Sequence, residues 1–215
     1  MKWYLAFLVT ALLFATVTAS AATLEQQLVD AARAGKTSVV SALIEKGADV
    51  NSVDKDGSTA LMRAVVNGRE DTVKLLIKSG ADVNMKDATG STALMGAAFN
   101  GQTAILRALL GAGAEVNAKA ADGETALMYA SVMGHTAIVR ALIDKHADVN
   151  TRNGAKVTAL MGAAMAGHAG VVKALLDGGA DVGAKDEKAK TALMYAKEKG
   201  RKDVVDILVK AGAKE

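Results

Sequence analysis

Residues 57–64 read GSTALMRA, and the four-residue phrase at their centre is written five times along the chain. The phrase Thr-Ala-Leu-Met begins at residues 59, 92, 125, 158 and 191, so each copy starts 33 residues after the one before it. A self-similar period between about 20 and 50 residues is the sequence signature of a stacked repeat protein. The chain is therefore predicted to form a stack of similar units.

A second phrase keeps the same period and helps to predict the content of each unit. Gly-Ala-Asp-Val-Asn begins at residue 47 and again at residue 80, with close variants at 113, 146 and 179 and a fading Gly-Ala at 212. Thr59 is a good N-cap for a short first helix, and Gly68 can end that helix. The apolar stripe from Asp71 to Lys78 predicts a second helix, buried on more than one side. Gly57 and its equivalents mark the tips of tight turns between units.

This unit closely resembles that of the ankyrin repeat family, which has the same length and the same order of parts. The family carries Thr-Pro-Leu-His where this chain has Thr-Ala-Leu-Met, and the resemblance covers residues 24–215. It implies an all-α solenoid of stacked helix-turn-helix units joined by β-hairpin loops. The implied units are residues 24–53, 54–86, 87–119, 120–152, 153–185 and 186–215, all within a single domain of residues 22–215.

Three positions depart from the family pattern. Lys156 and Ala189 stand where three earlier hairpins have Gly, and His146 replaces the Gly after a second helix. Gly154 lies close to Lys156 and could take the left-handed backbone angle in its place. The geometry of these two hairpins is therefore left open.

Residues 1–21 predict a cleavable signal peptide. Lys2 is the only charge before Glu25, an apolar run follows, and Ala19-Ser20-Ala21 is a small-residue cleavage pattern. The apolar run is shorter than the roughly 20 residues of a membrane span. We therefore expect an exported protein, in the periplasm or else secreted, without stable membrane insertion after cleavage. We also expect a monomer.

Composition narrows the chemistry. The chain has no Cys, which excludes thiol catalysis, Cys-ligated zinc and iron–sulfur clusters. It has no Pro either. His135 and His168 recur at the repeat spacing, so they are expected on neighbouring units and not around a shared substrate. No convergent set of nucleophile, base and metal ligands is visible, so no enzyme activity, metal or cofactor is predicted. Scarce aromatic residues and a formal net charge of +3 argue against a nucleic-acid partner.

The repeated methionine suggests an alternative function. Met62 and its four equivalents could supply thioether groups to Cu(I) or buffer oxidants in the cell envelope. The simpler interpretation is that these side chains fill the core of each first helix.

The favoured function is binding of a partner protein, because stacked repeats present an extended concave surface. Carrying the family's contact positions onto this chain places Phe99 and Tyr129 near the middle of that surface. A regular line of basic residues before the hairpins predicts an acidic surface on the partner. The expected contact residues on the first helices are Arg63, Val66, Asn67, Phe99, Asn100, Tyr129, Val132, Met133, Met165 and Tyr195, and those of the basic line are Lys86, Lys119, Arg152 and Lys185.

Overall fold

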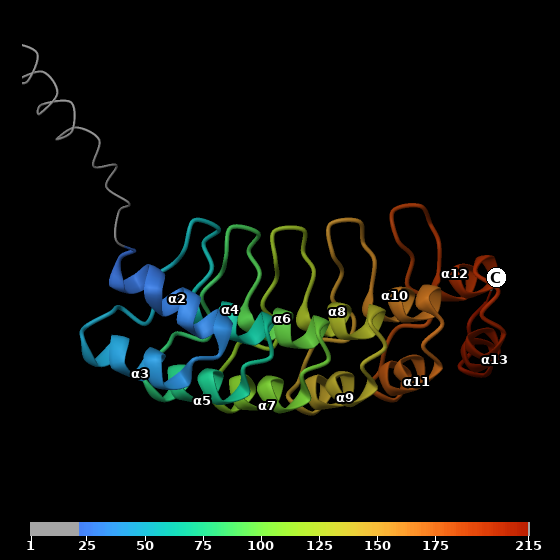
Figure 1. The fold of residues 1–215 in the computed structure, drawn as a ribbon. Helices are drawn as coiled ribbons and strands as arrows, with labels where there is room; N and C mark the ends of the chain where they lie inside the picture. The colour runs from blue at the N-terminus through green and yellow to red at the C-terminus, as the bar shows by residue number, and fades with distance from the viewer. Residues whose placement is uncertain (1–21, 215) are drawn as a thin grey trace, which may run out of the picture.

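The structure, a computed structural model, describes residues 22–214 and shows two parallel rows of helices (Figure 1). Neighbouring units pack first helix on first helix and second helix on second helix. The row of first helices, from which the loops project, contains α2 (Leu24–Ala34), α4 (Ala60–Val66), α6 (Ala93–Phe99), α8 (Ala126–Val132), α10 (Ala159–Ala166) and α12 (Ala192–Glu198). The other row contains α3 (Thr37–Glu45), α5 (Glu70–Lys78), α7 (Thr103–Gly111), α9 (Thr136–Asp144), α11 (Ala169–Asp177) and α13 (Lys202–Lys210). The predicted all-α solenoid is confirmed.

The Thr-Ala-Leu-Met phrase starts five of the first helices as predicted. The hydroxyl of Thr59 accepts the backbone N–H of Met62 at 3.2 Å and so satisfies a free donor of the first turn. The thioether of Met62 in turn lies 3.5 Å from the backbone N of Thr59. The hydroxyl contact recurs at each of the other four copies, at 3.3–3.5 Å.

The rest of the phrase builds the core. Leu61 and its equivalents in the next four units are buried, and burying a Leu side chain stabilises a fold by about 1.5–3 kcal/mol. Four of the repeated methionines are buried as well, which agrees with the core-filling interpretation. Met194, in the last unit that the structure describes, is the exception at 39% exposed.

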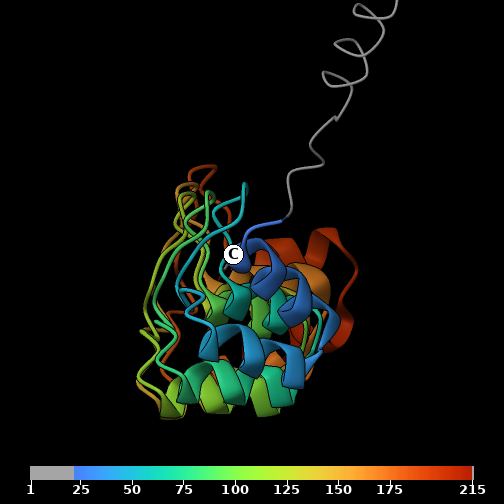
Figure 2. The same cartoon turned by 60° about the vertical axis from the view of Figure 1, so that its left-hand side comes forward.

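The loops between units have the shape of hairpins and project together beyond the first helices (Figures 1 and 2). Within residues 22–214 they contain no β-strand, and the one isolated bridge joins Val53 to Thr59. Backbone bonds tie each loop tip to the next: Ala88 N donates to Asp56 O at 3.2 Å, and Ala121 N to Thr89 O at 3.0 Å. The β-hairpins implied by the family resemblance are therefore turns linked into a row.

The departures at Lys156 and Ala189 preserve this geometry. Both residues have a φ of 59°, so each takes the left-handed conformation that Gly has in the other loops. Lys156 N donates to Asn153 O at 2.9 Å, as Gly57 N does to Asp54 O. The suggestion that Gly154 takes the left-handed angle is wrong, because the loop closes at Lys156. His146 also has a positive φ, of 63°.

Side chains at one position of the second phrase join consecutive units. Asn84 Oδ1 accepts the backbone N–H of Glu115 at 2.8 Å, and Asn84 Nδ2 donates to Gly113 O at 3.2 Å. Asn117 and Asn150 make the same pair of bonds to the units that follow them. We call this series, which begins at Asn51 and ends at Asn150, the asparagine ladder.

A second ladder uses the residue after the glycine that ends each first helix. The imidazole Nε2 of His135 lies 3.0 Å from Phe99 O, and that of His168 lies 2.9 Å from Val132 O. Arg69 and Arg201 donate to the equivalent carbonyls of their preceding units. The expectation that the two histidines lie on neighbouring units with structural tasks is confirmed.

Among residues 22–214 no helix combines the length and the apolarity needed to cross a membrane. The predicted signal peptide, residues 1–21, lies outside the described residues.

Candidate functional site

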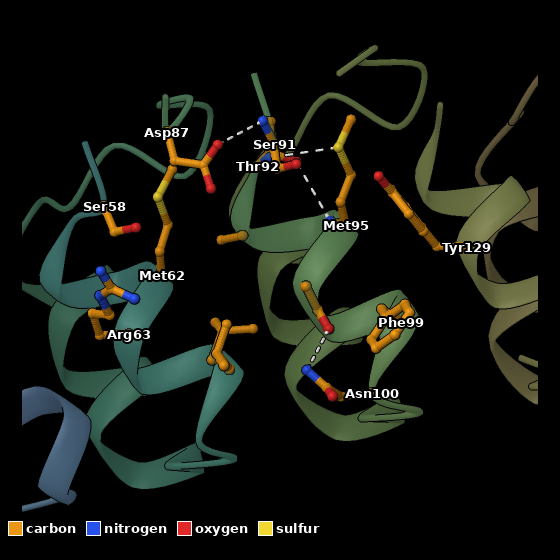
Figure 3. Close-up of a pocket in the computed structure, with 14 residues that line it drawn as sticks. Ser58, Met62, Arg63, Asp87, Ser91, Thr92, Met95, Phe99, Asn100 and Tyr129 are labelled. Carbon is orange, nitrogen blue, oxygen red and sulfur yellow. Dashed lines mark hydrogen bonds between the residues drawn. The ribbon is translucent and has the colours of Figure 1, made fainter. Parts of the chain in front are cut away.

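One hollow on the described part of the molecule lies where the loops meet the first helices. It has a volume of about 320 Å³, and its walls come from α4, α6 and the loops before them, with Tyr129 of α8 at one end (Figure 3). We call the surface formed by the loops and the first helices the groove face. Its position between loops and first helices is that expected from the family resemblance.

An aromatic pair forms one wall of this hollow. The rings of Phe99 and Tyr129 meet edge to face, with centroids 6.1 Å apart and an interplanar angle of 81°. Such contacts hold both rings in place, although Phe99 remains 47% exposed. Beyond the pair, a second hollow of about 280 Å³ is lined by Val132, Met133 and acidic residues of the next loop. The pair therefore divides one groove into two parts.

Exposed apolar side chains form a row across four units. Val66, Phe99, Val132 and Met165 are spaced by 33 residues, and each lies at or next to the end of a first helix. They are 39–55% exposed, and Met133 beside them is 41% exposed. The equivalent positions in the terminal units are charged, Arg33 and Glu198. We call these four side chains the apolar row.

The groove also carries negative charge. Asp87 lines the first hollow, and Asp122 and Glu124 line the second. Burial raises the pKa of the half-buried Glu124 carboxyl, and Asp122 beside it adds to the shift. The pKa of Tyr129 is raised first by burial and then by the charges of Asp122 and Glu124. Both shifts indicate a poorly hydrated, negative environment around Tyr129.

The structure places the basic line along the loops, where all four residues are exposed. Two of these side chains are engaged within the fold. Lys86 Nζ donates to Lys119 O at 2.9 Å, and an Arg152 Nη donates to Lys185 O. The line therefore helps to hold neighbouring loops together, in addition to any contact with a partner.

Other expected contact residues also have internal partners. Arg63 forms ion pairs with Asp54 at 2.7 Å and Asp56 at 2.6 Å, and Tyr195 donates its hydroxyl to Asp186. The amides of Asn67 and Asn100 donate to Arg63 O and Gly96 O of their own helices. The apolar row and Met133, by contrast, present exposed surface.

The sequence-based list of contact residues missed Asp87 and Gly96. A signal for both was available: when the units are aligned, Gly96 occupies the position of Arg63, Tyr129 and Tyr195. The position is large in these three units and is glycine only at Gly96 and Gly162, so the missing side chain of Gly96 leaves space beside Asp87.

Within the part of the chain that the structure describes, the histidines and the repeated methionines are not gathered around one point. No group of three or more His, Cys, Asp or Glu side chains in residues 22–214 is arranged to hold a metal ion. The nitrogens of His135 and His168 that face the preceding unit contact backbone carbonyls. Met62, Met95, Met128 and Met161 are buried in successive layers, and packed helices lie roughly 8–10 Å apart. Their sulfurs therefore do not converge on one point.

Comparison with known proteins agrees with this geometry. A family described as "Ankyrin repeats (3 copies)" matches residues 9–87, 28–120, 82–153 and 146–215. The crystal structure of an ankyrin repeat domain from Acinetobacter baumannii AYE is similar, with a TM-score of 0.80 and 32% identity over 87% of this chain and 98% of that one. The ankyrin repeat protein EF0377 has a TM-score of 0.80 and 30% identity over 86% of this chain and 97% of its own. A search of curated proteins finds no match. The chain belongs to the ankyrin repeat family.

Proposed function

We propose that this protein binds a partner protein on the groove face and does no chemistry of its own. Ankyrin repeats are in general protein–protein interaction modules. The observation that carries the proposal is the apolar row, which keeps four apolar side chains 39–55% exposed across four consecutive units. Contiguous exposed apolar surface on a folded protein marks a site of interaction, because leaving it in water is unfavourable.

The aromatic pair gives this surface its anchor. Phe99 lies near the middle of the row and is held by Tyr129, so little side-chain entropy is lost when a partner covers it. The hollows on either side of the pair can each receive a side chain of the partner. The asparagine ladder and the row of linked loop tips keep the units in register, which favours a surface formed before binding.

The basic line supports an acidic partner surface less strongly than the apolar row supports an apolar one. Lys86 and Arg152 already bond to backbone carbonyls of the next unit. Charges engaged in this way contribute to the field around the loops but are not free to form a close ion pair. We propose a partner that is apolar at its centre, and no role for nucleic acid or for a metal-buffering methionine ladder.

Export of the chain and its monomeric state are part of the proposal. The support for export is the basic start, the apolar run and the Ala19-Ser20-Ala21 pattern of residues 1–21. N-terminal sequencing of the protein recovered from an envelope fraction tests the cleavage after Ala21. Light scattering of residues 22–215 tests the monomer.

The binding function is tested by affinity capture with matched variants. Immobilised residues 22–215 are exposed to an envelope extract, and retained proteins are identified by mass spectrometry. The groove variant Val66→Ser, Val132→Ser removes two members of the apolar row. The control Val39→Ser, Val209→Ser removes two equally exposed valines from α3 and α13, in the other row of helices.

We expect a discrete partner that is retained by the wild-type protein and the control and lost by the groove variant. Retention of the same proteins by all three, or loss from both variants, would refute binding on the groove face.

A further inference from the structure

In two units the first residue of the loop is an Asp that bonds to the fourth residue of the helix that follows, nine residues later. In the unit of residues 54–86 this pair is Asp54 and Arg63, with Arg63 Nε 2.7 Å from Asp54 Oδ2. In the last unit it is Asp186 and Tyr195, whose hydroxyl donates to Asp186 Oδ2. The side chain on the helix therefore satisfies the second carboxylate oxygen of the loop residue.

In the unit of residues 87–119 this arrangement is incomplete. Asp87 Oδ1 closes the loop by accepting the N–H groups of Thr89 at 2.8 Å and Ser91 at 3.0 Å, as the equivalent oxygens of Asp54 and Asp186 do. The helix position opposite is Gly96, which has no side chain to reach Oδ2. No ion pair among residues 22–214 involves Asp87.

The space left by Gly96 is open. A Cβ placed on Gly96 would meet only Val65 Cγ1 at 3.6 Å and Val66 Cγ2 at 3.7 Å, which are ordinary contacts. The first hollow occupies this place, with Asp87 above it and Phe99 at its side (Figure 3). At the equivalent Gly162 the situation differs, since a Cβ there would lie 2.7 Å from Val132 Cγ2.

The charge around the hollow favours a cation. Asp87, Asp122 and Glu124 are the acids of the groove, and the last two help to raise the pKa of Tyr129. Arg63, the basic residue that lines this hollow, is already shared between two carboxylates. A partially buried carboxylate without a cation attracts one from a partner more strongly than an exposed carboxylate does.

The geometry points to an arginine side chain of the partner as the occupant of this hollow, with its guanidinium paired to Asp87 Oδ2. This inference rests on the proposed function and names the chemistry that the groove recognises. The incoming group takes the place that Arg63 holds in the preceding unit, while apolar neighbours of the arginine lie on Val66 and Phe99. Arginine fits better than lysine because its planar fork pairs with a carboxylate and packs on aromatic rings.

The test uses a short peptide whose charge alone is varied. Isotope-labelled residues 22–215 are titrated with acetyl-Ala-Leu-Arg-Leu-Ala-amide, and amide shifts are followed by NMR. The comparison peptide replaces arginine with citrulline, which has the same shape and no charge. We expect shifts centred on Asp87, Gly96 and Phe99, and binding about tenfold weaker for the citrulline peptide, the usual loss for a charge-assisted bond.

Three variants test whether binding of the arginine peptide depends on the carboxylate of Asp87. Asp87→Asn removes the charge while keeping the loop-closing Oδ1, and we expect about a tenfold loss of arginine-peptide affinity. Gly96→Arg fills the hollow with the chain's own guanidinium and is expected to abolish binding. Asp177→Asn removes one exposed acid from α11 and should leave affinity unchanged. Thermal unfolding of each variant establishes that it is folded.

The inference is overturned if both peptides bind equally, if Asp87→Asn binds like wild type, or if no shift occurs at about 10 mM peptide. These outcomes are separable from failure of the proposed function. Suppose that a captured partner is lost by the Val66→Ser, Val132→Ser variant but retained by Asp87→Asn and Gly96→Arg. That result would support binding on the groove face and refute the pairing of a partner arginine with Asp87. Capture that is indifferent to the valine changes would refute the groove face itself.

Discussion

The asparagine ladder stops one unit before the end of the chain, and the substitution Gly183→Asn should extend it. Asn150 Oδ1 accepts the backbone N–H of Asp181, 31 residues later, and its Nδ2 donates to the carbonyl of Gly179, 29 residues later. The same offsets from residue 183 lead to the N–H of Lys214 and the carbonyl of Gly212. Gly183 N already donates to Asp181 Oδ1 at 2.9 Å, as Asn150 N does to Asp148 Oδ1, so the backbone is in position.

The expected gain follows from the bonds. Two neutral hydrogen bonds contribute about 1 kcal/mol each, and replacing Gly lowers the entropy of the unfolded chain by about 0.5 kcal/mol. Because the site is exposed and near the chain end, we expect a total stabilisation of about 1–2 kcal/mol. The gain should appear in urea unfolding and as slower hydrogen exchange at the Lys214 amide.

The matched control is Gly183→Ala, which removes the same backbone freedom without adding an amide. A Cβ at residue 183 meets only Asp181 Oδ1 at 3.4 Å, so the control should fold normally. The reverse change, Asn150→Gly, should weaken the junction between the last two units by a similar amount. If Gly183→Asn protects Lys214 no better than Gly183→Ala does, the ladder does not hold the units together as argued.

Three further predictions concern single positions. Gly96→Ala should raise the free energy of unfolding by about 1 kcal/mol, because Gly is that much less favourable than Ala inside a helix and the Cβ meets no close neighbour; an unchanged urea midpoint would contradict this. Lys156→Gly should add about 1 kcal/mol by relieving the positive φ of 59°, and a loss of stability would show that the Lys side chain matters more than the backbone angle. The hydrogen bond to Asp186 raises the pKa of Tyr195 to about 12, so absorbance at alkaline pH should show this phenol ionising last, and Asp186→Asn should lower its pKa. Since the folded-state pKa is raised, the stabilisation is complete below the unfolded value of about 10 and is lost as the pH rises from there to about 12, which pH-dependent unfolding can measure.

Much of the fold could be predicted because its determinants are local and repeated. Thr59 and its equivalents cap helices through bonds that span three residues, and Gly68 and its equivalents end them through a backbone angle that favours Gly. Each of these local signals is weak alone, but the prediction is strengthened because the same residues recur every 33 positions. The order of helices, loops and stacked units follows from them.

The candidate site was predicted only in outline. The positions of Phe99, Tyr129 and Val132 on the groove face follow from the resemblance to the ankyrin repeat family. The sequence pattern does not reveal which of these side chains already bond to other residues of the same chain. Arg63 is held by Asp54 and Asp56, and Lys86 reaches across to the next unit, although both stand at family contact positions.

The sequence by itself determined the repeat length and the helix caps, because these depend on neighbours within one unit. Only the tertiary structure decided that His135 and Asn117 bridge units, that Met194 is exposed at the end of the stack, and that Asp87 faces the empty space at Gly96. Those features arise between units, or between a loop and a helix nine residues away. They depend on distances in the stacked solenoid that no local pattern specifies.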